Sequence, residues 1–314
     1  MTPSSKIFIA GHRGLVGSAL LRALSAANFT NLLTAPRPTL DLTSPAATDL
    51  FFATHRPDFV FLAAAKVGGI LANATYPADF LRDNLAIQLN VLTSAHRYGV
   101  KKLAFLGSSC IYPKNAPQPI KEEYLLTGPL EPTNEWYAIA KIAGIKLCQA
   151  FRAQYNFNAI ALMPTNLYGP GDNFDLHTSH VLPALLRKFH TAVTEAHSTV
   201  TLWGSGTPLR EFLHVDDLAS ASLFLMQHYN EPEIVNIGTG QDLTITALAQ
   251  LIARITGFTG KIVLDPSKPD GTPRKLLDVS RLHAMGCHHR IELEEGIRAT
   301  YQWYLQNSAH QVVA

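Results

Sequence analysis

The stretch Lys6-Ile-Phe-Ile-Ala-Gly-His-Arg-Gly-Leu-Val-Gly17 decides the fold of this chain. Its first five residues predict a short buried strand, and Gly17–Ala27 carries small and apolar side chains at helical spacing. The glycines between them let the backbone turn sharply and let a pyrophosphate approach without a Cβ in the way. The helix N-terminus then offers free N–H groups to that phosphate. We interpret this stretch as a dinucleotide-binding turn rather than an ordinary tight turn.

Strand-length apolar runs continue to alternate with helical patterns through the first half of the chain. Strands are predicted at Lys6–Ala10, Leu32–Thr34, Phe59–Ala63, Leu103–Leu106, Ala159–Met163 and Ile234–Ile237. Helices are predicted near Ala47–Thr54, Leu85–Tyr98, Tyr137–Tyr155 and Leu293–Leu305. This βαβ alternation implies a parallel sheet covered on both faces. The fold class is therefore α/β, a Rossmann-type doubly wound parallel sheet.

The alternation of strand and helix patterns becomes less regular after Pro164, where turn-rich loops such as Trp203–Gly206 and Pro266–Pro273 appear. Neither an internal repeat nor a low-complexity linker separates two independent domains. We therefore expect a smaller, sequence-interleaved substrate-binding lobe. Residues 1–166 plus about 213–239 are expected to form the dinucleotide-binding domain, and about 167–212 plus 240–314 the substrate lobe.

The composition excludes several classes of function. With 314 residues, 47% of them hydrophobic, the chain buries a sizeable core. A net charge of +2 without blocks of like charge argues against nucleic-acid or membrane partners. Cys110, Cys148 and Cys287 lack metal-ligand spacing and suit a reducing compartment. Because we find neither a signal-peptide pattern nor a membrane-spanning run, we expect a cytoplasmic protein without a metal.

The residues after the second predicted strand indicate which dinucleotide binds. An acidic residue there would hold the 2′-hydroxyl of NAD. Instead the strand ends in Thr34-Ala-Pro-Arg37, and Arg13 lies inside the glycine turn. Because guanidinium groups suit a 2′-phosphate, we predict NADP(H). Asp41 and Leu42 contact the adenine side, or Asp41 only caps the next helix.

Tyr137 and Lys141 are four residues apart, so they share one face of a predicted helix. We expect the Lys141 ammonium to lower the pKa of Tyr137, which then exchanges a proton with a carbonyl oxygen. Ser108, at the carboxyl end of a central strand, gives the same oxygen a second hydrogen bond. Alone, the pair would be two neighbours on a surface helix. With the glycine turn and Ser108 it predicts a carbonyl-reducing site.

Seven stretches carry a resemblance to a known family. They are Gly11–Gly17, Ala63–Gly69, Leu106–Pro113, Glu131–Lys141, Met163–Gly169, Arg210–Asp217 and Lys268–Lys275. On these stretches the chain resembles the extended short-chain dehydrogenase/reductases and, within them, the GDP-L-fucose synthase family. The run Ser108-Ser-Cys110 and the stretch Lys268-Pro-Asp-Gly-Thr-Pro273 are specific to this narrower family.

The resemblance implies a two-part reaction on GDP-4-keto-6-deoxy-D-mannose, in a homodimer formed through the helices near 85–98 and 137–155. Protons at C3 and C5, acidified by the C4 ketone, are removed and returned on the opposite face. NADPH then delivers hydride to C4. Cys110 and His180 match the family's epimerisation acid and base, and both side chains exchange protons near neutral pH. Ser108 and Tyr137 stabilise the oxyanion formed at C4.

The same resemblance implies the remaining site residues. Lys188 and Arg210 meet the diphosphate, Trp203 offers a flat surface to the guanine or sugar, and Asp270 accepts ligand hydrogen bonds. The whole substrate set is Ser108, Ser109, Cys110, Asn166, Lys188, Trp203, Arg210 and Asp270. The cofactor set is Gly11, His12, Arg13, Gly14, Leu15, Val16, Gly17, Arg37, Asp41, Leu42, Ala64, Leu106, Gly107, Tyr137, Lys141, Pro164, Thr165, Asn166, Leu167 and His180.

Two places depart from the family pattern. Relatives carry His-Pro after Asp-Asn-Phe, whereas this chain reads Asp172-Asn-Phe-Asp-Leu-His-Thr-Ser-His180, so His177 is a second imidazole near His180. The run Cys287-His-His289 also departs, and we interpret it as a surface loop.

Two other functions are compatible with a dinucleotide-binding fold. A reductase or epimerase acting at C4 of a UDP-sugar is disfavoured by Cys110 and the 268–270 loop. A non-catalytic nucleotide-sensing module is disfavoured by the intact reactive residues.

Overall fold

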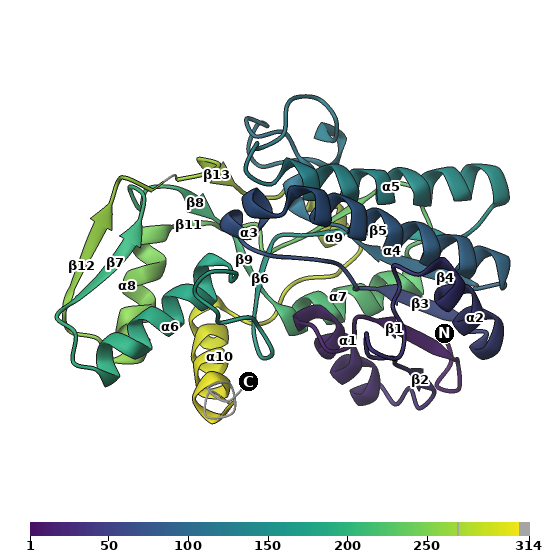
Figure 1. Ribbon diagram of the computed structural model, residues 1–314, viewed down its shortest axis with the longest axis horizontal. Helices are drawn as coiled ribbons and strands as arrows, with labels where there is room; N and C mark the ends of the chain where they lie inside the picture. The colour runs from purple at the N-terminus through teal and green to yellow at the C-terminus, as the bar shows by residue number, and fades with distance from the viewer. Residues whose placement is uncertain (269, 308–314) are drawn as a thin grey trace.

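The computed structural model describes residues 1–268 and 270–307 and is centred on a six-stranded parallel sheet (Figure 1). The strand order is β2-β1-β3-β4-β5-β10. The strands are β1 (Ile7–Ala10), β2 (Leu32–Leu33), β3 (Phe59–Leu62), β4 (Lys102–Leu106), β5 (Ala159–Pro164) and β10 (Val235–Ile237). Each predicted strand is present, with ends shifted by a single residue at most. The predicted α/β class is confirmed.

Helices cover both faces of this sheet because side chains alternate between its faces. Ile7 and Ile9 of β1 pack with α1 (Leu15–Ala26) and α7 (Val215–His228) on one face. Phe8 points to the other face, where α2 (Pro45–His55), α4 (Pro77–Arg97) and α5 (Glu135–Tyr155) lie. Figure 1 shows α4 beside α5 across the sheet from α1 and α7. Burial on both faces explains why the strands read as continuous apolar runs.

The glycine turn lies where the order of the strands reverses. From β1 the chain passes to β2 on one side, and β3 then pairs with the other side of β1. In open parallel sheets a ligand crevice forms at this switch point, outside the carboxyl ends of the strands. The turn therefore occupies the position where such folds bind dinucleotides.

The later part of the chain builds a second lobe around its own core. The helices α6 (Val181–Thr194), α8 (Ile245–Thr256) and α10 (Leu293–Asn307) enclose a cluster that includes Phe189 and Ile252. Short sheets flank them: β7 (Thr199–Trp203) with β12 (Lys261–Asp265), and β8 (Leu209–Arg210) between β11 (Leu243–Thr244) and β13 (Arg274–Lys275). A further pair, β6 (Asn166–Tyr168) and β9 (Phe212–His214), lies beside the large sheet.

Four short helices complete the described structure: η1 (Ser109–Ile111), η2 (Glu122–Tyr124), α3 (Ile70–Thr75) and α9 (Ser280–Ala284). Between the segments of the second lobe the chain returns to the large sheet to add α7 and β10. Within the described residues no helix combines the length and apolarity needed to span a bilayer.

A buried lysine joins the large sheet to the end of α7. Lys102 is 4% exposed, and its ammonium donates hydrogen bonds to the carbonyl oxygens of Leu225, Met226 and Tyr229 at 3.0, 2.7 and 2.6 Å. Burial lowers the pKa of Lys102 to about 8. The Leu225 oxygen also accepts from the Tyr229 nitrogen at 3.0 Å, but the last carbonyls of a helix have no partner within it, so the lysine supplies the donor for the Met226 and Tyr229 oxygens.

Replacing Lys102 with Met should destabilise the protein by about 3 kcal/mol, because it leaves the Met226 and Tyr229 carbonyls without this donor, whereas the Leu225 oxygen still accepts from the Tyr229 nitrogen. Urea unfolding followed by circular dichroism measures this change. The matched control is Lys101→Met, since Lys101 is exposed and, within the described residues, its ammonium pairs with Asp58 alone; we expect less than about 1 kcal/mol there. Equal effects of the two substitutions would contradict the assigned role of Lys102.

Candidate active site

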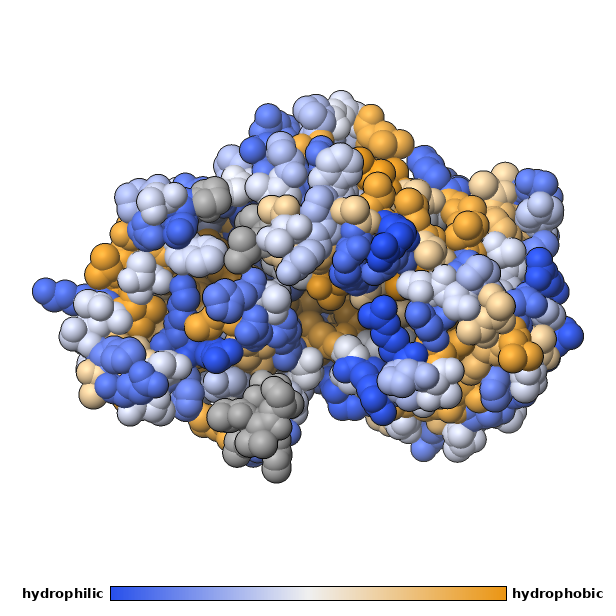
Figure 2. All heavy atoms as spheres, viewed as in Figure 1, coloured by the Kyte–Doolittle hydropathy of each residue, from blue (hydrophilic) through white to orange (hydrophobic). Residues whose placement is uncertain are grey.

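A cavity of about 870 Å³ opens between the carboxyl ends of the large sheet and the second lobe. Figure 2 shows this hollow in the middle of the molecule, with hydrophobic residues in its depth and hydrophilic residues around it. Its wall is formed by the glycine turn, the ends of β3, β4 and β5, the start of α5, and parts of α6, β7 and β8. The cavity is thus built from both lobes.

Nearly all residues predicted for the site line this one cavity. His12 and Arg13 do not, and Arg13 is exposed outside it. The predicted residues that line it are Gly11, Gly14, Leu15, Val16, Gly17, Arg37, Asp41, Leu42, Ala64, Leu106, Gly107, Ser108, Ser109, Cys110, Tyr137, Lys141, Pro164, Thr165, Asn166, Leu167, His180, Lys188, Trp203, Arg210 and Asp270.

The lack of a side chain has a different consequence at each of the three glycines of the turn. Gly11 has φ +87°, and a Cβ on it would lie 2.7 Å from the Ala64 nitrogen. A Cβ on Gly17 would lie 2.1 Å from the Gly11 oxygen, so both positions require glycine for close packing. Gly14, the N-cap of α1, would meet only the Gly11 oxygen at 3.5 Å. The space in front of Gly14 belongs to the cavity, and it fits a phosphate approaching the helix N-terminus.

At the far end of this region, Arg37 is exposed and lines the cavity after β2. The Asp41 carboxylate accepts hydrogen bonds from the Thr43 nitrogen at 3.0 Å and the Thr43 hydroxyl at 2.8 Å, and these bonds lower the pKa of Asp41. Helix α2 is capped by Ser44, which accepts from the Ala47 nitrogen. Asp41 therefore shapes the loop before α2 and does not cap that helix.

The reducing residues converge at the end of β4. Ser108 follows this strand and caps η1, accepting a hydrogen bond from the Cys110 nitrogen at 3.4 Å. Lys141 is 4% exposed, and its ammonium donates to the Leu106 oxygen at 2.6 Å. The same ammonium lies 5.7 Å from the centre of the Tyr137 ring. Helix α5 thus brings its Tyr-Lys pair to the strand end that carries Ser108.

The expectation that the pKa of Tyr137 is lowered is wrong. Burial, followed by the nearby Cys110, raises the pKa of Tyr137, whereas burial lowers the pKa of Lys141 to about 8. Loss of water around the phenol disfavours its charged form and sets the direction of the pKa shift. The Lys141 ammonium is directed at the Leu106 carbonyl oxygen rather than at the phenol. Tyr137 is therefore a neutral phenol at neutral pH, the form that donates a proton to a carbonyl oxygen.

Cys110 and His180 lie on opposite lobes and face the same cavity. Burial raises the pKa of Cys110, opposed by Lys275, by a hydrogen bond with Ser108 and by Lys141. His180 is the N-cap of α6, and its side chain is accessible from the cavity while protein atoms surround it on its other sides. Desolvation, followed by Lys275, lowers the pKa of His180. Near neutral pH the pair offers a protonated thiol and an unprotonated imidazole, as removal and return of a proton require.

Cations gather around an exposed ring in the second lobe. Trp203 is 52% exposed, and the ammonium groups of Lys188 and Lys268 lie 5.3 and 5.7 Å from its ring centre. Arg210 donates a hydrogen bond to the Asp270 backbone oxygen at 3.3 Å. The Asp270 carboxylate accepts from the nitrogen and hydroxyl of Ser205 at 2.7 and 2.8 Å. Asp270 therefore braces the turn after Trp203, in addition to lining the cavity.

Sequence reasoning missed several charged residues of the cavity wall: Lys66, Asp83, Glu131, Asp172 and Lys275. The last of these, Lys275, also shares a small side pocket with Cys110. It closes a stretch that carried the family resemblance, of which Pro269 lies outside the described residues. The available signal was alternation along β13, because Arg274 pairs with Asp242 outside the site, at 2.6 Å. The next side chain along a strand points to the opposite face.

Of the two stretches that depart from the family pattern, the one before His180 borders the cavity and the one at Cys287–His289 does not. His177 is exposed and lines the cavity near His180. The ring of His288 lies 4.3 Å from that of His283, away from the cavity. Over residues 1–268 and 270–307, no group of three or more His, Cys, Asp or Glu side chains is placed to hold a metal ion.

Comparison with known proteins identifies the class to which this fold and cavity belong. The sequence profile of the NAD dependent epimerase/dehydratase family matches residues 7–238. The chain belongs to this family.

Full-length relatives narrow the class. The chain is 60% identical to GDP-L-fucose synthase 1 of Arabidopsis thaliana, over 97% of this chain and 94% of that protein. It is 55% identical to the GDP-L-fucose synthase of Escherichia coli (strain K12), over 96% and 97% of the two chains. The structure of a GDP-L-fucose synthetase from Naegleria fowleri bound to NADP superposes with a TM-score of 0.90 at 29% identity, covering 98% and 96%. Within the family, the chain belongs with the GDP-L-fucose synthases, and the resemblance seen in the sequence is confirmed.

One buried carboxyl group in the loop leading to His180 lacks a full set of partners. Asp172 is 7% exposed and accepts one hydrogen bond, from the Asn173 nitrogen at 2.7 Å. Its other oxygen has no hydrogen-bond partner among the described residues. Burial raises the pKa of Asp172 to about 7, and the Asn173 bond opposes this only in part.

Asp172→Asn should stabilise the protein at pH 8 by on the order of 1–3 kcal/mol and have little effect at pH 4. The folded carboxyl binds a proton below about pH 7, whereas the unfolded one does so only below about pH 4. Stability contributed by the protonated form is therefore lost as pH rises through this window. Urea unfolding of both proteins at the two pH values measures the difference. A variant less stable than the parent at pH 8 would contradict this account.

Proposed function

We propose that this protein is a bifunctional GDP-L-fucose synthase. It epimerises GDP-4-keto-6-deoxy-D-mannose at C3 and C5 and then reduces C4 with NADPH to form GDP-L-fucose. The observation that carries the proposal is that Cys110 and His180 line the same cavity as Ser108, Tyr137 and Lys141. Reduction alone needs only the last three, whereas the thiol and imidazole add the proton-transfer groups that epimerisation requires. The high identity to GDP-L-fucose synthases supports the same substrate.

The cofactor assigned to the glycine turn is NADP(H), which supplies the hydride when bound. Gly14 leaves room at the N-terminus of α1, where free N–H groups meet a pyrophosphate. Arg37, after β2, is placed for a 2′-phosphate, and no acidic residue ends that strand. Arg13 lies outside the cavity, so we assign the 2′-phosphate contact to Arg37 rather than to both arginines.

Epimerisation uses the acidity that a ketone gives to its neighbouring carbons. Ser108 and the neutral phenol of Tyr137 donate hydrogen bonds to the C4 oxygen, which stabilise the negative charge that forms there. One member of the Cys110–His180 pair takes the proton from C3 or C5, and the other returns a proton to the opposite face. Each epimerisation thus conserves the number of protons on the sugar and inverts one carbon.

Reduction uses the same carbonyl site. As C4 receives hydride, Tyr137 transfers its phenolic proton to the oxygen and Ser108 keeps its hydrogen bond. Lys141 is held in place through the Leu106 oxygen, where its positive charge favours the phenolate that remains. The residues that acidify C3 and C5 are therefore those that complete the alcohol at C4.

The second lobe is assigned to the nucleotide. Lys188 and Arg210 supply positive charge for the diphosphate, and Trp203 supplies a flat, exposed ring for the guanine or sugar. Asp270 acts through the turn that it braces at Ser205. We assign residues 1–166 and about 213–239 to the cofactor domain and the remaining segments to this lobe, in line with the separate core around Phe189.

We further propose that the protein works as a cytoplasmic homodimer that pairs α4 and α5 of two copies. Leu89 of α4 and Ile139 of α5 are apolar and yet 52% and 41% exposed, which a second copy would cover. Cys110, Cys148 and Cys287 are free thiols, and this suits a reducing compartment.

Incubation with GDP-4-keto-6-deoxy-D-mannose and NADPH in deuterium oxide tests the function. We expect oxidation of NADPH together with deuterium at C3 and C5 of the product. Turnover of a UDP-hexose with neither of these signals would overturn the proposal. A UDP-4-keto sugar as a parallel substrate measures how much the nucleotide contributes to recognition.

Single substitutions should impair epimerisation and reduction to different extents. Tyr137→Phe removes the proton donor and should lower the rate of NADPH oxidation about 100-fold or more, while deuterium exchange persists at a reduced rate. Cys110→Ser replaces an acidic thiol by a far weaker acid and should suppress deuterium exchange to a similar degree. Single-turnover measurements of both signals distinguish the variants. Unchanged exchange in Cys110→Ser would remove this residue from the epimerisation chemistry.

The glycine turn offers a matched pair of variants. Gly14→Ala has room for its methyl group in the fold but places it in the cavity, so NADPH affinity should fall about tenfold or more with little change in stability. Gly17→Ala places its Cβ against the Gly11 oxygen and should unfold at lower temperature. NADPH fluorescence titration and thermal unfolding measure the two effects. Equal NADPH affinity of Gly14→Ala and the parent would contradict the assigned phosphate position.

A further inference from the structure

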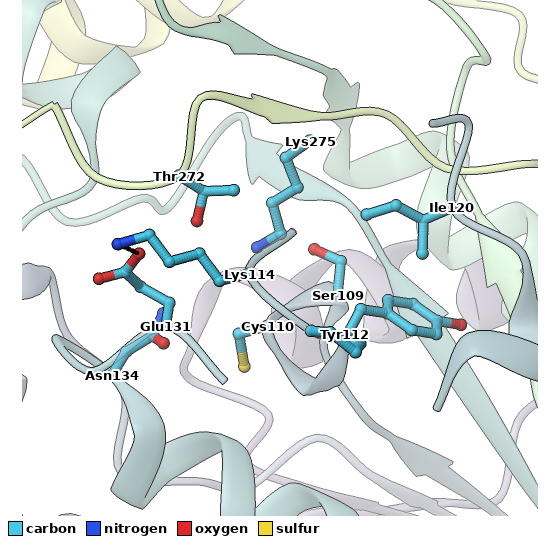
Figure 3. A pocket seen from close by; sticks show the side chains of 10 residues that line it. Ser109, Cys110, Tyr112, Lys114, Ile120, Glu131, Asn134, Thr272 and Lys275 are labelled. Carbon is cyan, nitrogen blue, oxygen red and sulfur yellow. Dashed lines mark ion pairs between the residues drawn. The ribbon is translucent and has the colours of Figure 1, made fainter. Parts of the chain in front are cut away.

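A small side pocket opens behind Cys110, and Lys275 is part of its wall. The pocket has a volume of about 20 Å³, room for about one water molecule. Figure 3 shows Lys275 extending from its strand toward the segment that carries Ser109 and Cys110. Lys275 and Cys110 also line the large cavity, so the lysine lies where the two spaces meet.

The backbone around Lys275 is firmly held. Lys275 pairs with Arg210 in the register of β13 and β8. Immediately after it, the Leu276 nitrogen donates to the Gln118 side chain at 2.9 Å, and the Leu277 nitrogen donates to the Glu211 carboxylate at 3.1 Å. These bonds fix the strand from which the side chain of Lys275 extends, and a fixed charge is what a preorganised site needs.

The positive charges around this pocket are not equivalent. Lys114 forms an ion pair with Glu131 at 3.0 Å, as Figure 3 shows, so its charge is largely compensated. Lys141 donates to the Leu106 oxygen. Among the residues that the structure describes, no hydrogen bond or ion pair occupies the ammonium of Lys275. Burial lowers the pKa of Lys275, and Cys110 is the first of the groups that oppose this shift, ahead of Glu211, whereas Arg210 adds to it. The charged forms of Lys275 and Cys110 therefore favour each other.

The charge of Lys275 affects the pKa of both the Cys110 thiol and the His180 ring. Burial raises the pKa of Cys110, and Lys275 is the strongest of the influences that oppose it. Lys275 also adds to the desolvation that lowers the pKa of His180. The titratable and charged groups around the thiol are Tyr137 and Lys141 of α5, Lys114 and Glu131 of the pocket loops, His180 at the start of α6, and Lys275 of β13.

We propose that Lys275 is a positioning residue for epimerisation: its ammonium stabilises the thiolate of Cys110 and disfavours the imidazolium of His180. Lys275 thereby sets which member of the pair carries charge when a proton leaves C3 or C5. The role in epimerisation rests on the function proposed above, whereas the effect on the thiol is a property of the protein alone.

The test is the rate of alkylation of Cys110 by iodoacetamide as a function of pH, in the full chain, with the modified peptide identified by mass spectrometry. In Lys275→Met the alkylation profile should shift to higher pH, and the rate at pH 7.5 should fall about tenfold, as for one pKa unit. Lys275→Arg keeps the charge and should restore the profile. Cys287 in the same digest reports general changes in reactivity.

Arg274→Met is the matched control, because it removes the same charge from the same strand on the other face. It should leave the Cys110 profile unchanged. The proposal is overturned if Lys275→Met alkylates as the parent does, or if Arg274→Met shifts the profile equally. A raised KM for the nucleotide sugar with unchanged alkylation would also overturn it, since Lys275 would then serve diphosphate binding.

The link to epimerisation has its own readout. The pH profile of deuterium entry at C3 and C5 should shift to higher pH in Lys275→Met by the same amount as the alkylation profile. Because alkylation needs no substrate, a normal alkylation shift in a protein that fails to turn over the GDP-sugar would count against the proposed function alone. An absent alkylation shift in an active enzyme would count against Lys275 alone.

Discussion

A single buried carboxylate holds together the segments on which the cavity depends. Glu211 is fully buried, directly after β8. Its oxygens accept hydrogen bonds from the backbone nitrogens of Thr239, Gly240 and Leu277 at 2.7, 2.8 and 3.1 Å. Each of these N–H groups would be costly to bury unpaired. The carboxylate thus joins the segments after β8, β10 and β13, which are remote in sequence.

This constraint positions the charges of the site. Arg210 precedes Glu211 directly, and Lys275 lies two residues before Leu277. Asn166 and Thr165 donate to the backbone oxygen of Glu211, at 2.7 and 3.4 Å, so the end of β5 is fixed to the same residue. The cavity therefore has a rigid wall between the two lobes, and its polar groups are set by backbone contacts rather than by flexible side chains.

Features that depend on residues close together in the sequence could be predicted, whereas features that depend on contacts between remote segments could not. The strands of the large sheet are buried on both faces, so their apolar runs are visible locally, and the reactive residues follow because strand ends converge at one edge. The strands β8 and β13 were not predicted, since each has two residues and depends on partners such as Glu211. The pKa of Tyr137 was misjudged because burial is a tertiary property that residue spacing does not reveal.

The late arrival of α7 and β10 has a consequence for synthesis on the ribosome. Ile7, Ile9 and Phe61 lie on the face of the sheet that α7 covers together with α1, yet α7 begins only at Val215. Until more than two-thirds of the chain has been made, part of this apolar face has nothing to pack against. The nascent sheet can therefore complete its core only after β10, which ends at Ile237, has been made, and its N-terminal segments cannot finish folding by themselves before then.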